Sequence, residues 1–154
     1  MACNNRKSPI WQKIRGALAG LLPAARSVKP SSGSWGEARA AAELQRRGYT
    51  IIGRRVRVGR RDEIDLVTRQ GGVLVFVEVK TRKNEQFGRP AQAVTPRKRH
   101  CLCRAAVRYM RRLHPPPSYF RFDVVEVVGA PGGPPPVIRH IENAFTLERR
   151  YRAP

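Results

Sequence analysis

The chain has 154 residues and a mass of 17.4 kDa, which suits one domain and leaves too little sequence for two independent hydrophobic cores. Hydrophobic residues make up 41% of the sequence, a share that argues against a wholly disordered chain. Lysine and arginine number 31 against 11 acids, so the formal net charge of +20 favours polyanionic partners such as nucleic acid. Because most of these bases are arginines, a compositional bias is the alternative origin of the charge.

The cysteines Cys3, Cys101 and Cys103 are too few for a disulfide framework, and their number is odd. We therefore expect free thiols in a reducing compartment, which makes the cytoplasm the predicted location. No uncharged apolar run approaches the roughly 20 residues that cross a bilayer, so no stable membrane insertion is expected.

Residues 1–33 differ from the rest because they carry lysines and arginines and no acid. Apolar residues between positions 10 and 22 recur at helical spacing and predict a short amphipathic helix. Pro30 and the serines and glycine after it read as a linker. Three interpretations are open: a signal peptide, a basic helix on a membrane or on nucleic acid, or a loosely ordered extension. Alanine and glycine dilute the apolar segment, which favours the extension.

The predicted domain occupies residues 34–146 and begins with a helix. Ser34-Trp35-Gly36-Glu37 has the spacing of a capping box, an alanine-rich stretch follows, and Gly48 is a suitable C-terminal stop. Residues 49–52 then read as a strand.

A hairpin is predicted next, with strands at residues 64–68 and 73–79 and a turn at residues 69–72. The stretch 73–77 is apolar without alternation, which is typical of a central strand that is covered on both faces.

Thr95-Pro96 supplies an N-cap and a proline at the first helical position, so a second helix is predicted from there through Leu113. Strands at residues 120–128 and 137–141 complete the order helix, three strands, helix, two strands. This order predicts an α/β fold in which helices flank one mixed five-stranded sheet. Residues 147–154 are left as a C-terminal tail.

Acids are scarce in this chain, and four of the eleven fall in the predicted hairpin: Asp62, Glu63, Asp65 and Glu78. If the turn centres on residues 70–71, Asp65 lies opposite Phe76 on the neighbouring strand. Glu63 then lies opposite Glu78, and Asp65 becomes a diagonal neighbour of Glu78, roughly 7 Å away. Both carboxylates could reach one metal ion from these positions.

Carboxylates gathered this closely need a positive partner. At an effective dielectric of 20, two of them about 5 Å apart repel by about 3 kcal/mol, and burial raises at least one pKa unless a cation joins them. A Mg²⁺ ion held by carboxylate oxygens is one solution. Salt bridges to nearby arginines or to Lys80 are the other, and the residue pattern alone leaves both open.

The spacing of Asp65, twelve further residues and Glu78-Val79-Lys80 resembles the D…(D/E)-x-K signature of restriction-endonuclease-like nucleases. Further segments, in the same order, resemble the YraN-like family of uncharacterised bacterial proteins over about residues 34–146. These segments are Gly36-Glu37, Gly48-Tyr49, Glu63-Ile64-Asp65-Leu66, Val75–Arg82, Arg121–Val125 and His140–Phe145. That family is similar to archaeal Holliday-junction resolvases and is predicted to be nuclease-like.

The resemblance implies a restriction-endonuclease-like core and assigns roles by position. Asp65 and Glu78 match the metal-binding acids of the catalytic centre, and Lys80 matches the lysine that orients or activates the attacking water. Glu37 matches the first-helix glutamate that completes the site in resolvase relatives. Glu63 matches a family position and is a further candidate metal ligand.

The expected function is therefore metal-dependent hydrolysis of phosphodiester bonds, with Mg²⁺ or Mn²⁺ as cofactor and nucleic acid, DNA in preference to RNA, as partner. Branched DNA and a homodimer follow from the analogy with resolvases alone. A nucleic-acid-binding protein of the same fold without catalysis is the alternative. One departure from the family is Asp62, which stands where glycine is usual and is expected to alter the turn into the strand.

A basic stretch from residue 95 to residue 121 contains no acid. Arg97, Lys98 and Arg99 crowd the positive end of the predicted helix dipole, at a cost of roughly a few tenths of a kcal/mol each unless an anion lies there. A nucleic-acid phosphate would relieve that conflict. We therefore assign these three residues and Arg82 to nucleic-acid binding, with a solvated basic face as the alternative.

The remaining polar and aromatic positions receive structural assignments. Asp123 lies between apolar residues in a predicted strand and is expected to pair with an arginine. The three histidines are scattered and give no ligand pattern, and Tyr109 and Phe145 are expected in the core.

Overall fold

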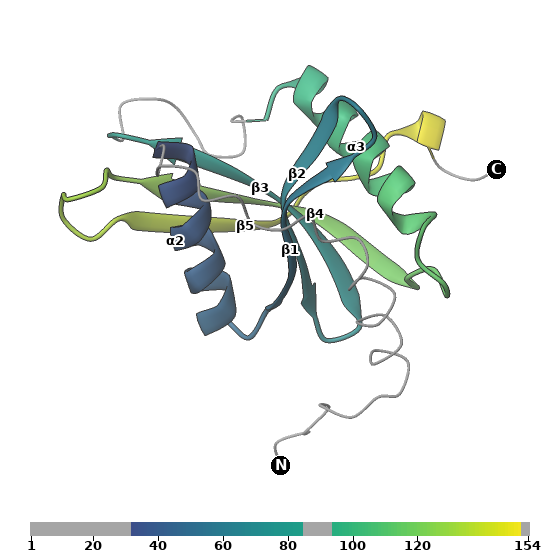
Figure 1. The fold of residues 1–154 in the computed structure, drawn as a ribbon, viewed down its shortest axis with the longest axis horizontal. Helices are drawn as coiled ribbons and strands as arrows, with labels where there is room; N and C mark the ends of the chain where they lie inside the picture. Colours follow the sequence, from purple (N-terminus) through teal and green to yellow (C-terminus); the bar gives the residue numbers. More distant parts are fainter. Residues whose placement is uncertain (1–31, 85–93, 152–154) are drawn as a thin grey trace, which may run out of the picture.

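Five strands form one mixed sheet in the computed structural model, which describes residues 32–84 and 94–151. They lie in the order β1 (Thr50–Val58), β2 (Asp62–Gln70), β3 (Val73–Arg82), β4 (Tyr119–Val128) and β5 (Val137–Phe145). Neighbours are antiparallel except β3 and β4, which are parallel. Two helices, α2 (Ser32–Arg46) and α3 (Pro96–Met110), pack on the sheet, and the short 3-10 helix η2 (Arg149–Tyr151) follows β5 (Figure 1).

The parallel pairing of β3 with β4 explains the position of α3 in the chain. A tight turn cannot join parallel neighbours, so the connection must cross over the sheet, and α3 lies in that connection. The predicted α/β fold, with helices flanking one mixed five-stranded sheet, is confirmed and is consistent with a restriction-endonuclease-like core.

The hydrophobic core has two layers, one on each face of the sheet. Alternate residues of β3 divide between them, because strand side chains point to opposite faces. Leu74 and Phe76 belong to the layer that includes buried residues of α3, and Val75 and Val77 belong to the layer that includes those of α2. This arrangement confirms the prediction of a central strand covered on both faces. Tyr109 packs edge-on against Phe76 with ring centroids 5.8 Å apart, so its predicted place in the core is also confirmed.

Helix α2 begins earlier than the sequence predicts. Its first residue is Ser32, so Ser34 and Glu37 lie inside the helix and the predicted capping box is wrong. The C-terminal stop is confirmed, because Gly48 has φ +86° and the next amide, Tyr49 N–H, donates a hydrogen bond back into the last turn. Glu37 is therefore not a capping residue, and its carboxylate is available for another role.

Helix α2 approaches β3 closely at Gly36. A Cβ at this position would lie 1.8 Å from Thr81 Oγ1, so either the Thr81 side chain or the helix would have to shift to accommodate it. The glycine thus brings the helical turn that carries Glu37 against the C-terminal end of β3.

Several predicted boundaries are wrong. Strand β2 covers Asp62–Gln70 rather than 64–68, and β3 continues beyond 79 to Arg82. Strand β1 runs to Val58 rather than ending at residue 52, and β5 continues beyond 141 to Phe145, whereas α3 ends at Met110. The second half of β1 is rich in exposed arginines, yet its backbone pairs with β2, as in Arg57 opposite Glu63. Apolar alternation does not reveal such an edge strand, because its side chains mostly face solvent.

Residues 147–151, assigned from the sequence to a tail, contribute Leu147 and Tyr151 to the packing on the core layer beneath α3. The predicted N-terminal extension lies outside the described residues except for Ser32 and Gly33.

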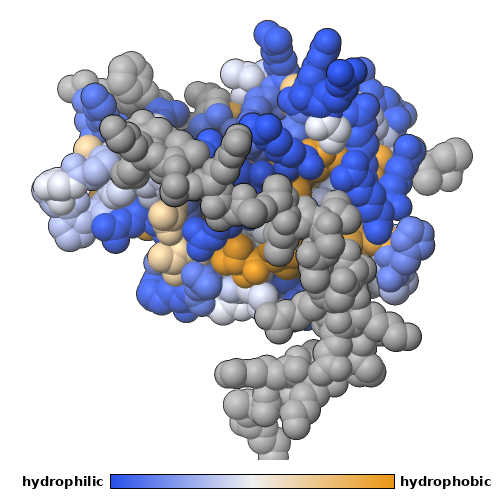
Figure 2. Space-filling view, viewed as in Figure 1, coloured by the Kyte–Doolittle hydropathy of each residue, from blue (hydrophilic) through white to orange (hydrophobic). Residues whose placement is uncertain are grey.

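Hydrophilic side chains prevail over the described surface in the view of Figure 2. The exposed large apolar side chains in the described ranges are Tyr119 and Val137. Cys101 and Cys103 are free thiols, as predicted, and Cys3 lies outside these ranges. None of the helices in residues 32–84 and 94–151 has the length and apolar character needed to cross a membrane.

Candidate active site where β2 and β3 separate

The register of the β2–β3 hairpin places the two central acids opposite each other. The strands pair from Gln70 with Val73 to Leu66 with Val77. The predicted register, with Asp65 opposite Phe76, is therefore wrong, because the turn consists of the two glycines at 71–72. Gly71 has φ +56°, a left-handed conformation that glycine adopts without steric cost. One residue beyond the last pair, this register brings Asp65 opposite Glu78.

Strand β2 separates from β3 at Asp65. The paired register with β3 ends at Leu66, whereas β2 stays paired with β1 as far as Asp62. In the opening, Val79 N–H donates a hydrogen bond of 2.7 Å to Asp65 Oδ2. The carboxylate of Asp65 is thus fixed by backbone of the neighbouring strand at the point where the strands part.

Glu78 is a buried acid with two lysines beside it. Its residue surface is 2% exposed, Lys80 Nζ lies 2.8 Å from Oε1, and Lys98 Nζ lies 3.1 Å from Oε2. The Oε2 atom is buried and has no hydrogen bond, because the approach of Lys98 lacks hydrogen-bond geometry. Lys80 comes from the same strand and Lys98 from the first turn of α3.

Glu37 and Glu63 meet through an arginine that the sequence did not identify. Arg55 Nε lies 3.5 Å from Glu37 Oε2 and 3.6 Å from Glu63 Oε1. Glu63 also pairs with Arg57, whose Nε is 3.3 Å from Oε2. Arg55 has φ +48°, which is uncommon for a residue other than glycine. The predicted strand ends at residue 52, so the sequence does not place Arg55 in β1. Its position in the full-length strand brings its side chain to these acids.

The pKa values show that the acids act on one another. Burial, followed by the charge of Glu78, raises the pKa of Asp65 to about 6, although the Val79 N–H and Lys98 oppose the rise. Burial also raises the pKa of Glu37, with the charges of Glu63 and Glu78 adding to the effect and Arg55 opposing it. Asp65, Glu78 and Glu37 are therefore within electrostatic reach of one another.

The same acids also change the pKa of Lys98. Burial lowers the pKa of Lys98, but the charges of Glu78 and Asp65 outweigh burial, so the net shift is upward. The side chain is thus held as an ammonium ion inside an acidic environment.

The donor set suits a hard divalent cation in its chemistry. Carboxylate oxygens are the ligands that Mg²⁺ prefers, and Glu78 Oε2 is a buried carboxylate oxygen without a hydrogen bond. No group of three Asp, Glu, His or Cys side chains within residues 32–84 and 94–151 is gathered closely enough to hold a metal ion as it stands. Around Glu78 the positive charge comes from lysines instead.

The four residues predicted to bind nucleic acid lie in different surroundings. Lys98 points to Glu78, whereas Arg82 Nε lies 3.2 Å from Glu126 Oε1. Arg99 Nε donates to Val94 O at 3.0 Å. Arg97 is exposed near the start of α3.

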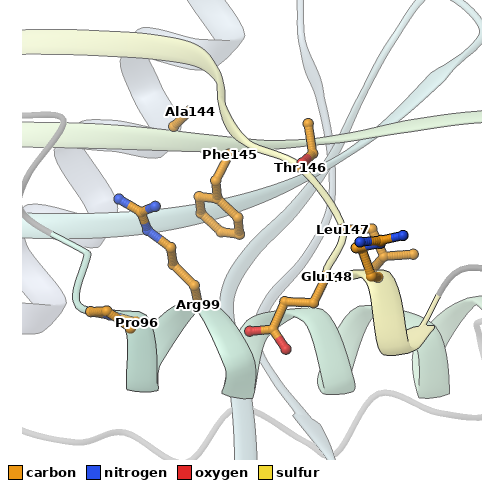
Figure 3. A pocket seen from close by; sticks show the side chains of 8 residues that line it. Pro96, Arg99, Ala144, Phe145, Thr146, Leu147 and Glu148 are labelled. Carbon is orange, nitrogen blue, oxygen red and sulfur yellow. The ribbon is translucent and has the colours of Figure 1, made fainter.

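Arg99 lies beside a separate pocket of about 580 Å³ between α3 and the segment after β5. Its guanidinium lies over the ring of Phe145, 5.6 Å from the centroid. Figure 3 shows Arg99 and Glu148 on the side of this pocket that faces α3. The lining residues are Pro96, Arg99, Ala144, Phe145, Thr146, Leu147, Glu148 and Arg149. In the first turn of α3, the side chain of Lys98 therefore contacts the acidic site, whereas that of Arg99 lines a separate pocket.

Asp62, the departure from the family pattern, joins α3 to the hairpin. Arg104 donates to it through Nε at 2.9 Å and Nη2 at 2.6 Å, and Arg108 Nη1 lies 3.3 Å away. The hydrogen bonds of Arg104 lower the pKa of Asp62 despite its burial. This acid has a structural partner and stands apart from the candidate site.

A second buried network surrounds Asp123. Arg121 Nε is 3.0 Å from Oδ1, which confirms the predicted arginine partner, and Asn143 N–H donates to the same oxygen at 2.9 Å. The sequence did not identify His140, whose side chain is fully buried with Nε2 2.8 Å from Oδ2. Its Nδ1 is buried without a hydrogen-bond partner.

Comparison with known proteins gives one consistent group of relatives. The sequence profile described as Uncharacterised protein family UPF0102 matches residues 36–127. A UPF0102 protein of Symbiobacterium thermophilum is 50% identical over 113 residues, which cover 73% of this chain and 94% of the relative. Similar proteins of Syntrophomonas wolfei and Geobacter sulfurreducens are 43% and 44% identical, cover 73% of this chain in both cases, and are themselves covered over 96% and 86%.

Proposed function

The chain belongs to the uncharacterised protein family UPF0102, the YraN-like family that its motifs resemble, and from that premise we propose that it is a metal-dependent endonuclease. One observation carries the proposal: Glu78 is a buried carboxylate opposite Asp65, with Lys80 two residues further along its own strand. An acid whose pKa is raised by burial and by the charge of a second acid, next to a lysine, is typical of a catalytic centre rather than of a structural ion pair.

Asp65 and Glu78 would hold a divalent cation of the Mg²⁺ or Mn²⁺ class. Such a cation, when bound, acidifies a water molecule and neutralises charge on phosphoryl oxygens. Asp65 is already oriented, because its Oδ2 accepts the Val79 N–H. Glu37, with its raised pKa, and Glu63 are further acids at the edge of the same site.

Lys80 has a geometry that suits a positioning role toward water and phosphate. Its Nζ contacts Glu78 Oε1 at 2.8 Å while 31% of its side chain stays exposed. An ammonium group has three donors, so one can hold Glu78 while another donates to a water molecule or to a phosphate oxygen.

The net charge of +20 supports nucleic acid as the substrate class, since a strongly basic protein attracts polyanions. DNA, and branched DNA in particular, is favoured by the resemblance to resolvases. A homodimer is proposed on the same analogy, and a solution mass measurement tests it.

Cleavage assays test the proposal directly. The full chain is incubated with labelled linear duplex, flap and four-way-junction DNA and with single-stranded RNA, each with Mg²⁺ or Mn²⁺. We expect cleavage by the wild type and a loss of about 100-fold or more in Glu78→Gln, because a ligand and its charge are removed. The matched control is Glu43→Gln, an acid that is paired with Arg46 and Arg47 on the surface of α2. Cleavage that survives in Glu78→Gln contradicts the assignment.

A nucleic-acid-binding protein without catalysis is the second candidate. The observation in its favour is that Lys80 and Lys98 already neutralise Glu78. Binding of the same substrates, without cleavage under any of the metal conditions, would select this candidate over the nuclease.

A further inference from the structure

Glu78 has two positive partners that differ in how firmly they are held. Lys80 lies on the same strand and contacts Oε1 at 2.8 Å, a distance typical of a charge-assisted hydrogen bond. Lys98 comes from α3 and lies 3.1 Å from Oε2, which nevertheless has no hydrogen bond although it is buried. Oε2 is thus the oxygen of this carboxylate that can gain a partner.

The backbone of Lys98 is fixed, but its side chain has a route out of the site. Lys98 N–H donates to the N-cap hydroxyl of Thr95 at 3.3 Å, which holds the first turn of α3. Its side chain is 36% exposed and ends a flexible four-carbon stem. The ammonium group can therefore leave Glu78 and reach solvent without any change in the helix.

Charge also limits what can share the site with Lys98. In formal charge, the carboxylates of Asp65 and Glu78 match the ammonium groups of Lys80 and Lys98. A divalent cation added to this set would repel both lysines in a partly buried environment, where screening by water is weak. Lys98 has the longer contact and reaches Glu78 from a different element, so it is the one that gives way.

We propose that Lys98 is an exchangeable counter-ion of Glu78, which neutralises Oε2 when no divalent cation is bound and withdraws when one binds there. The inference rests on the proposed metal site and adds to it a competition between a residue of the chain and the cation. Lys98 thereby raises the cation concentration that is needed to fill the site, while Lys80 stays in place.

Direct binding of Mn²⁺ tests the competition without relying on activity. The Kd of the full chain for Mn²⁺ is measured at pH 8 by electron paramagnetic resonance of free Mn²⁺. Lys98→Met, and Lys98→Gln as a second variant that keeps a polar side chain without the charge, are expected to bind Mn²⁺ at least about tenfold more tightly than the wild type. The control Lys83→Met removes one exposed lysine from the same end of β3 and should leave the Kd unchanged. Glu78→Gln should abolish the site in every background.

The outcomes separate this inference from the proposed function. Equal or weaker Mn²⁺ binding by both Lys98 variants, with binding by the wild type intact, overturns the exchange and leaves the metal site standing. An equal gain in Lys83→Met overturns it as well, because the effect would then be one of net charge. Absence of Mn²⁺ binding in every form overturns both proposals.

A titration of the wild type with Mg²⁺ gives a second readout that needs no substitution. The side-chain ammonium signal of Lys98, followed by nuclear magnetic resonance, should move toward that of a solvated lysine while the Lys80 signal moves less. Equal changes at the two lysines would overturn the distinction between them.

Discussion

Glu78 and Asp123 are both acids with almost no exposed surface on neighbouring strands of one sheet, yet their surroundings differ. Both oxygens of Asp123 accept hydrogen bonds, and the donors are Arg121 Nε, His140 Nε2 and Asn143 N. Glu78 Oε2 has an ammonium group nearby and no hydrogen bond. A buried acid with every oxygen satisfied stabilises the fold, whereas one left incomplete beside a second acid is typical of a site that takes a ligand.

The same contrast separates two acids on β2. Arg104 forms two hydrogen bonds with Asp62 and lowers its pKa. Asp65, three residues along the strand, is partly buried near Glu78 and has its pKa raised to about 6. The Asp62 carboxylate therefore favours the folded state at neutral pH, and the Asp65 carboxylate opposes it.

Asp123→Ala should have the largest effect on stability and the smallest on cation binding. Removing this acid leaves the partly buried Arg121 without its main partner, which costs roughly 3–5 kcal/mol of unfolding free energy. Urea denaturation followed by circular dichroism measures the loss. Glu142→Gln is the control, because Glu142 pairs with the same arginine but is half exposed. A loss below about 1 kcal/mol in Asp123→Ala would remove the distinction between the two regions.

Asp65→Asn is expected to stabilise the protein at pH 8 by roughly 2–3 kcal/mol, since its carboxylate is ionised there against burial and Glu78. The folded pKa of about 6 lies above the ordinary 3.8. The stability that protonation contributes is therefore complete below pH 3.8 and is lost as the pH rises through 6. The asparagine oxygen can still accept the Val79 N–H. Urea denaturation at pH 4.5 and pH 8, in EDTA, should show the gain mainly at pH 8, and an equal gain at both contradicts the assignment.

Asp62→Asn should lower the unfolding free energy by about 2 kcal/mol at pH 7, because a charge-assisted pair with Arg104 is lost. The sign of the pH dependence is opposite to that of Asp65. The folded pKa of Asp62 is lowered, so its contribution is present above the ordinary pKa of 3.8 and is lost as the pH falls below it. Acid denaturation profiles of wild type and variant should therefore converge at low pH. Arg108→Met, at a half-exposed partner, should change stability little.

Much of the fold follows from local patterns in the sequence. Apolar stretches without alternation identify β3, and the glycine at 48 and the threonine-proline pair at 95–96 mark a helix end and a helix start. The hairpin register does not follow from such patterns, because it depends on whether residues 70–71 or 71–72 form the turn. That difference of one position moves Asp65 from a diagonal place to one opposite Glu78.

The acids of the site and Lys80 are predictable from the sequence, whereas the places of its other cations are not. The hairpin holds Asp65, Glu78 and Lys80, so their spacing in the sequence is enough to predict that they lie together. Arg55 and Lys98 reach the site from an edge strand and from a helix distant in sequence, and only tertiary packing brings them there. Among consecutive bases on α3, nothing local distinguishes the residue that turns inward from those that remain outside.

Two arginines of the first turn of α3, separated by one residue, test whether neighbouring bases have different roles, and the expected effect is the smallest of these predictions. Arg97 is exposed near the start of the helix, whereas Arg99 is engaged by Val94 O and the ring of Phe145. Arg97→Ala should change stability by less than about 0.5 kcal/mol and lower the slope of log K against log salt for duplex DNA by about 0.9, the contribution of one phosphate contact. Fluorescence anisotropy at several salt concentrations measures that slope. Arg99→Ala should leave the slope unchanged and lower stability instead, and equal slopes in the two variants would mean that these arginines act as one diffuse basic surface.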